Sequence, residues 1–60
     1  MTPEEYFAFV QRELRLTKSR FGNVWFDEDG QPHHVPDPYK IPYDRRREIL
    51  EEIRRGIVLP

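Results

Sequence analysis

The sequence contains no cysteine. This absence excludes disulfide bonds, thiolate catalysis, cysteine zinc sites and iron–sulfur clusters together. Small secreted domains commonly compensate for a small core with disulfides, whereas proteins of the reducing cytosol do not. The sequence therefore predicts a cytoplasmic protein.

The chain also lacks a long apolar run, and its first residues include Glu4 and Glu5 without a preceding basic segment. A membrane-spanning helix needs about 20 predominantly apolar residues, and a signal peptide begins with a basic region, so neither is expected. An excess of one charge is missing as well, because ten Lys and Arg stand against eleven Asp and Glu. Bulk attraction to nucleic acid or to an anionic membrane is therefore not predicted.

The length of 60 residues predicts one small domain over residues 1–60. A chain of this size buries only about 60% of the surface that its unfolded form exposes. Its core is therefore expected to hold roughly a dozen side chains, and its stability to be modest without a partner.

The first element that the sequence predicts is a helix over about residues 3–17. Thr2 fits an N-cap, Pro3 fits the first helical position and Glu5 completes a capping box. Apolar residues then recur at helical spacing and form a core-facing stripe. They are Tyr6, Phe7, Val10 and Leu14.

A β-hairpin is predicted over about residues 23–35. Residues 23–26 are rich in β-forming types, and residues 27–30 match a type I turn that ends on a left-handed glycine. This turn places Trp25 opposite His33. A tighter two-residue turn in the same segment stays an alternative and shifts the register by one residue.

Prolines at positions 36, 38 and 42 predict an extended connector over residues 36–43, because each proline disfavours helix in the residue before it. Asp44 is expected as the N-cap of a second helix over about residues 45–55, with Gly56 as its stop. The apolar face of this helix consists of Ile49, Leu50, Ile53 and Ile57.

These elements predict a small single domain of the α+β class with the order helix–β-hairpin–helix (αββα). An isolated hairpin is marginally stable in water. Both helices are therefore expected to pack on one face of a two-stranded antiparallel ribbon.

Acids and histidines gather between Asp27 and His34, where metal chemistry would be sought. Gly30 comes too early for an EF-hand loop that begins at Asp27. His33 and His34 are neighbours in a strand, so their side chains point to opposite faces and do not reach one ion. Asp27 and His33 lie near each other across the turn, but two ligands do not close a site. We expect no metal and no cofactor.

The sequence does not predict an enzyme. General acid–base catalysis needs groups held in a pocket with shifted pKa values, and a helix–hairpin–helix of this size offers little concavity. A ribonuclease-like pairing of His33 or His34 with the arginines at 45–47 stays an alternative.

The aromatic content of four Phe, three Tyr and one Trp exceeds what one small core readily holds. Trp, Tyr and Arg dominate binding hot spots, so unburied aromatics rimmed by charge predict a protein–protein surface. The expected apolar anchors are Phe9, Leu16 and Trp25. The expected charged contacts are Arg12, Arg15, Arg45 and Arg46. In the alternative interpretation, the connector folds back and covers the apolar groups with Tyr39 and Tyr43.

The basic triplet at residues 45–47 lies at the end of the second helix that the helix dipole disfavours for cations. Either Asp44 and Glu48 compensate, or the triplet contacts a phosphate or acidic side chains of a partner. Arg46 lies within the apolar arc, where its stem covers the core while its head reaches water.

The primary functional hypothesis is a small non-catalytic intracellular protein that regulates or inhibits a larger protein. Its size and lack of catalytic machinery suggest a phage or mobile-element origin. The alternative is a small DNA- or RNA-binding regulator that uses the basic stripe Arg12–Arg20, whose log affinity would fall linearly with log salt. A third hypothesis is a homo-oligomer with Phe9 and Leu16 in the self-interface.

Overall fold

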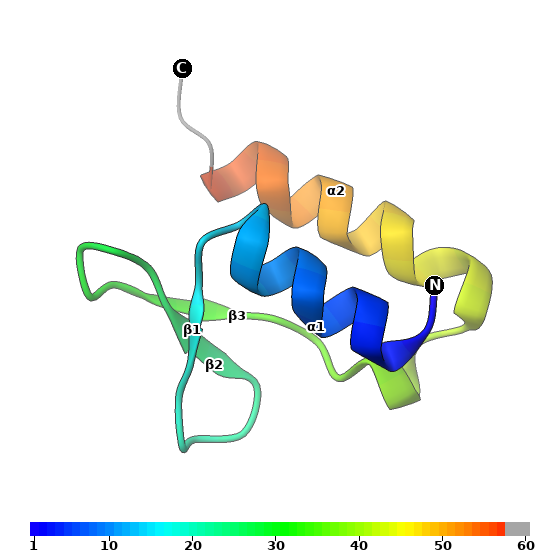
Figure 1. Ribbon diagram of the computed structural model, residues 1–60, viewed down its shortest axis with the longest axis horizontal. Helices are drawn as coiled ribbons and strands as arrows, with labels where there is room; N and C mark the ends of the chain where they lie inside the picture. The colour runs from blue at the N-terminus through cyan, green and yellow to red at the C-terminus, as the bar shows by residue number, and fades with distance from the viewer. Residues whose placement is uncertain (58–60) are drawn as a thin grey trace.

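The computed structural model describes residues 1–57, which form two helices, a small antiparallel sheet and two 3-10 turns (Figure 1). The elements are α1 (Pro3–Arg12), β1 (Thr17–Lys18), β2 (Val24–Phe26), β3 (Pro32–His34), η1 (Pro38–Lys40), η2 (Tyr43–Arg45) and α2 (Arg46–Ile57). The predicted α+β class is confirmed. Residues 58–60 of the predicted domain lie outside the described residues.

Helix α1 begins as predicted, with Thr2 as N-cap and a capping box closed by Glu5. It ends at Arg12, so the predicted extension to residue 17 is wrong. Arg15 has a φ of 55° and turns the chain out of the helix. Thr17 then pairs with β2 as strand β1. The apolar pattern was compatible with a longer helix, but pairing with the sheet prevails over it.

The sheet has three strands in the order β1-β2-β3, so the prediction of a two-stranded ribbon is wrong. The predicted register of the hairpin is confirmed, because Trp25 pairs with His33. The turn is also as predicted: the Gly30 amide donates to the Asp27 carbonyl at 3.0 Å, and Gly30 has a φ of 81°. Glycine adopts this left-handed conformation without a steric penalty.

The connector at residues 36–43 is not simply extended, because it contains η1 and the first residue of η2. The Asp37 carboxylate caps η1 by accepting from the Tyr39 amide at 2.9 Å. Asp44 lies within η2 and is not the N-cap of α2, and Gly56 lies within α2 instead of stopping it.

The core forms where α1 packs on the sheet and α2 packs on α1 (Figure 1). Phe7 of α1 stacks on Trp25 of β2 with ring centroids 6.1 Å apart. The main contacts of α2 are with α1 and η2, whereas the prediction placed both helices directly on the ribbon. The buried core side chains are Tyr6, Val10, Leu14, Leu16, Trp25, Val35, Ile41 and Leu50.

A buried tyrosine links α1 to the start of the connector. The Tyr6 hydroxyl donates to the Pro36 carbonyl at 2.6 Å. Burial, followed by the nearby negative charge of Asp37, raises the pKa of Tyr6 to about 12. The phenol therefore stays a neutral donor and fixes the position at which the connector leaves the sheet.

Within the described part of the chain, neither α1 nor α2 has the length and apolar character that crossing a membrane requires.

Candidate functional site

Two of the three predicted anchors lie in the core. Leu16 and Trp25 are only 3% and 2% exposed, so the expectation that they are available to a partner is wrong. The turn at Arg15 directs Leu16 into the core, and the Leu16 amide donates to the Val10 carbonyl at 3.2 Å. Trp25 lies in the central strand of a sheet that is one strand larger than predicted. Phe9, the third anchor, is partly buried against the same core.

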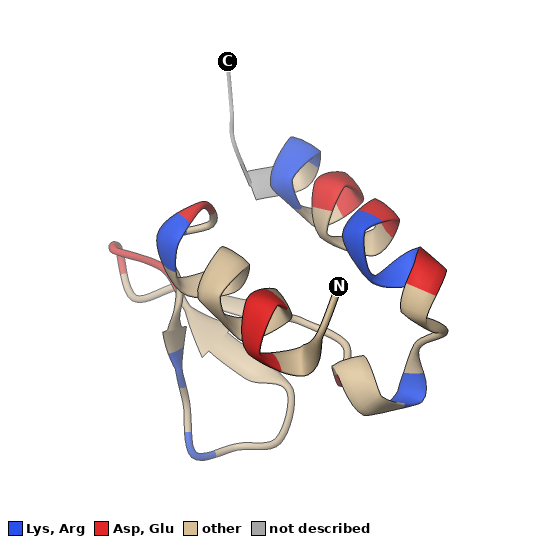
Figure 2. Cartoon of the chain, turned by 45° about the vertical axis from the view of Figure 1, so that its right-hand side comes forward, with Lys and Arg blue, Asp and Glu red and all other residues tan. Residues whose placement is uncertain are grey.

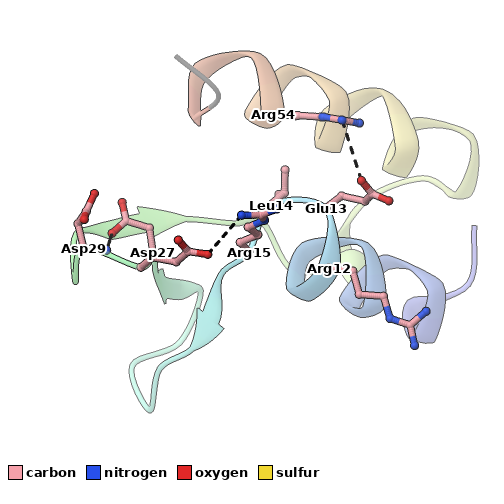
Figure 3. A pocket seen from close by; sticks show the side chains of 8 residues that line it. Arg12, Glu13, Leu14, Arg15, Asp27, Asp29 and Arg54 are labelled. Carbon is pink, nitrogen blue, oxygen red and sulfur yellow. Dashed lines mark hydrogen bonds and ion pairs between the residues drawn. The ribbon is translucent and has the colours of Figure 1, made fainter. Parts of the chain in front are cut away.

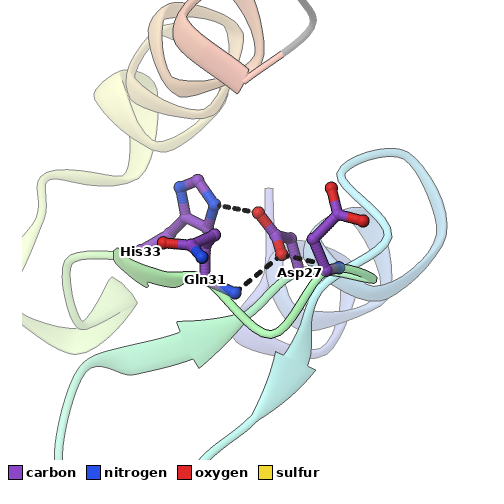
Figure 4. Close-up of polar contacts among 4 residues, drawn as sticks. Asp27, Gln31 and His33 are labelled. Atoms are coloured by element: carbon purple, nitrogen blue, oxygen red, sulfur yellow. Dashed lines mark hydrogen bonds and ion pairs between the residues drawn. The ribbon is translucent and has the colours of Figure 1, made fainter.

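The acidic turn between β2 and β3 is organised by Asp27 (Figure 4). One carboxylate oxygen lies 2.7 Å from Nε2 of His33, which confirms the expected proximity of these residues. The other oxygen accepts from the amides of Asp29 and Gln31, each at 2.9 Å. The hydrogen bond from His33, with those from the two amides, holds the pKa of Asp27 below its usual range. Asp27 therefore closes the turn.

Metal binding at this turn would need more ligands than the pair supplies. Within residues 1–57 no three His, Asp or Glu side chains come together in a group that could hold a metal ion. Asp27 already uses both carboxylate oxygens in hydrogen bonds to the turn and to His33. What the arrangement provides chemically is a fixed turn with an imidazole at its side.

A cleft of about 470 Å³ lies where the end of α1, the acidic turn and α2 meet (Figure 3). Arg15 lies 3.8 Å from Glu28, and Arg54 lies 4.0 Å from Glu13. These exposed ion pairs contribute only about 0–1 kcal/mol each. The lining residues are Arg12, Glu13, Leu14, Arg15, Asp27, Glu28, Asp29 and Arg54. The predicted contacts Arg12 and Arg15 thus share a cleft of mixed charge with carboxylates of this chain.

Two exposed tyrosines lie on the 3-10 turns of the connector. Tyr39 of η1 is 72% exposed and Tyr43 of η2 is 59% exposed. The connector does fold back on the core, as the alternative expected, but it covers the core with Pro38 and Ile41 and not with the two tyrosines. We name Tyr39, Tyr43 and the neighbouring Arg45 the connector surface.

Arg46 stabilises the connector surface through contacts of its guanidinium group. Its Nε donates to the Pro38 carbonyl at 2.9 Å, and its Nη1 donates to the Met1 carbonyl at 2.8 Å. The same guanidinium lies 5.6 Å from the ring centre of Tyr43. The guanidinium of Arg46 was expected to reach water. It instead contacts η1, η2 and the N-terminal residue and so links these three segments. Arg45 remains exposed at this position, 3.7 Å from Glu48.

The sequence reasoning missed a third exposed aromatic residue. Phe21 is 73% exposed and lies in the β1–β2 loop, which we define as residues 19–23. A signal for this loop was present: Gly22-Asn23 is a turn dipeptide, and Thr17 before it is a β-forming residue. Together they indicate a second hairpin ahead of the predicted one.

No family model, curated protein or solved structure matches this chain.

Proposed function

We propose that this chain is a small non-catalytic binding protein that regulates or inhibits a larger protein through the connector surface. The observation that supports this function most directly is the pair of exposed tyrosines, Tyr39 and Tyr43, on turns that Arg46 holds in place. The proposal thus keeps an aromatic and arginine surface but moves it from Leu16 and Trp25 to the connector.

The fixed conformation of these two turns lowers the free-energy cost of binding and so supports a binding role. Ordering loops and side chains on binding costs free energy, and a surface that is already fixed avoids part of this cost. The Asp37 cap on the Tyr39 amide and the Arg46 contact with Tyr43 hold the segment before any partner arrives. Tyrosine and arginine are also among the residue types enriched in hot spots.

The non-catalytic part of the proposal is supported by the structural role of Asp27, whose carboxylate accepts from the amides of Asp29 and Gln31 and so holds the turn. His33 and Asp27 are bonded to each other, and Asp27 also caps the turn. The cytoplasmic location is proposed on the absence of cysteine, and the phage or mobile-element origin on the small size.

Capture of partners with three matched baits tests this function. The baits are the wild type, Tyr39→Ala/Tyr43→Ala, and Phe21→Ala as the control for an exposed aromatic elsewhere. We expect a protein from nuclease-treated lysate of the source organism to bind the wild type and the control at least tenfold more tightly than the double variant. Equal binding by all three folded baits would exclude the connector surface.

The alternative function, a DNA- or RNA-binding regulator using Arg12–Arg20, needs a continuous basic stripe. The structure divides this stripe: Arg12 and Arg15 line the mixed-charge cleft, while Arg20 lies in the β1–β2 loop. The loop is the part of the stripe that still favours the alternative. Self-association through Phe9 and Leu16 loses support because Leu16 is buried.

A further inference from the structure

The β1–β2 loop is held in one shape by its own side chains. The Ser19 hydroxyl accepts from the Phe21 amide at 3.0 Å and donates to the Val24 carbonyl. The Lys18 amine donates to the carbonyls of Ser19 and Gly22. These bonds hold the loop from within, and Phe21 is left 73% exposed at its tip.

The charge around Phe21 has one sign. Residues 16–26 contain Lys18 and Arg20 and no Asp or Glu. In Figure 2 the connection between β1 and β2 shows blue and tan but no red, and it lies at the end of the sheet opposite to the red β2–β3 turn. Arg20 is exposed and has no ion pair among the described residues.

We propose that the β1–β2 loop is a contact site for single-stranded nucleic acid, in which Phe21 stacks on a base and Arg20 binds the adjacent phosphate. Lys18 uses two of its three N–H groups on the carbonyls of Ser19 and Gly22, and its charge is thereby held beside Arg20 and the same phosphate. An exposed aromatic ring beside unopposed cations is the combination that sequence-tolerant single-strand binding uses.

The tip of this loop is less suited to insertion into a pocket of a partner protein. Hot-spot residues lie within a ring of surrounding contacts that exclude water, whereas the neighbours of Phe21 are Arg20 and Gly22, with Asn23 following. A stacked base needs only the flat face of the ring and a cation near the backbone. This site is separate from the connector surface and does not depend on the function proposed for it.

Titration of the full chain with oligothymidylate and oligouridylate of eight nucleotides, followed by amide NMR shifts, tests the site. We expect the largest shifts at residues 19–23. Phe21→Leu, which keeps apolar bulk and removes the ring, should weaken binding about fivefold or more. Log affinity should fall with log salt at a slope of about −0.7 for contact through Arg20 alone and about −1.4 if Lys18 contributes.

Two controls decide between this site and other sources of binding. Tyr39→Ala/Tyr43→Ala should leave the oligonucleotide affinity within twofold, so a larger loss in this variant would overturn the loop as the site. Vesicles of phosphatidylcholine and phosphatidylserine offer the same phosphate chemistry on a lipid surface. Binding to vesicles without binding to oligonucleotides would overturn the proposal, as would unchanged affinity in Phe21→Leu or no loop shifts at millimolar oligonucleotide.

Discussion

The two turns that flank β2 are closed by side chains of opposite charge. The β2–β3 turn is closed by the Asp27 carboxylate, which accepts from two backbone amides and contacts His33. The β1–β2 loop is closed by the Lys18 amine, which donates to two backbone carbonyls, together with Ser19. In both turns a charged residue that would suggest a functional site from sequence is used to hold the backbone.

The two turns differ in the side chains that are not used to hold the backbone. At the β2–β3 turn the next acid, Glu28, faces Arg15 across the cleft, so the charge is partly compensated within the molecule. At the β1–β2 loop, Arg20 and Phe21 face solvent. A cluster of charges is therefore a poor guide to function until the residues that close the backbone have been identified.

The largest effect is expected from the strand that both turns share. Trp25→Ala should cost about 3–5 kcal/mol, as truncation of a buried aromatic residue does. A domain of this size has a total stability of about 3–9 kcal/mol, so the variant should lose at least about a third of this stability, and its circular dichroism should show unfolding at a much lower urea concentration than that of the wild type. Phe21→Ala, the exposed control, should change stability by about 0.5 kcal/mol or less. A folded Trp25→Ala with a normal urea midpoint would contradict the burial of this residue.

The second effect concerns the acidic turn and its pH dependence. The pKa of Asp27 is lowered in the folded state by the His33 hydrogen bond and by the turn amides. Its contribution to stability is therefore present above the ordinary aspartate pKa of 3.8 and is lost as the pH falls through the lowered folded value. Asp27→Asn should reduce the free energy of unfolding at neutral pH by less than Trp25→Ala does.

Urea unfolding at several pH values measures this contribution. The difference between the wild type and Asp27→Asn should narrow as the pH falls below the ordinary aspartate range. Asp29→Asn is the matched control because it removes a nearby acid of the same turn without touching the capping bonds. If the difference in free energy of unfolding between the wild type and Asp27→Asn stayed constant down to the lowest pH measured, ionised Asp27 would not be what closes the turn.

The third effect tests the basic loop. Lys18→Met keeps the stem beside Trp25, whose ring centre lies 5.9 Å from the amine, and removes the two donated hydrogen bonds. We expect a loss of about 1 kcal/mol in the free energy of unfolding, in line with ordinary hydrogen bonds. Lys18→Arg serves as the charge-retaining control. If Met is tolerated without loss, the loop is held by Ser19 alone.

The acidic turn was predictable from sequence because its signals are local. Asp at the first position and a left-handed glycine at the last specify the turn and, through it, the register of Trp25 and His33. The basic loop was missed because its evidence is non-local: Thr17 and Lys18 continue a sequence that reads as helix until they pair with β2. This missed strand also explains why Leu16 and Trp25 were expected at the surface.

The connector was intermediate in this respect. The sequence left Tyr39 and Tyr43 without a place in the core, in agreement with their exposure. It did not reveal the 3-10 turns that carry them, because the Arg46 contacts with Pro38 and Met1 join residues distant along the chain. The exposure of the two tyrosines could thus be anticipated from composition, whereas the Arg46 contacts that hold their turns could not.

The smallest effect is expected for the ion pair that joins the acidic turn to the end of α1. Arg15 and Glu28 lie 3.8 Å apart, with side chains 75% and 69% exposed, so solvent screens their attraction. A double-mutant cycle with Arg15→Ala and Glu28→Ala should give a coupling of about 0.5 kcal/mol or less, and added salt should reduce it further. The same cycle on Arg54 and Glu13 provides a matched pair. A coupling above about 1 kcal/mol at Arg15 and Glu28 would mean that the cleft helps to fix the acidic turn, and that closure by Asp27 is not sufficient.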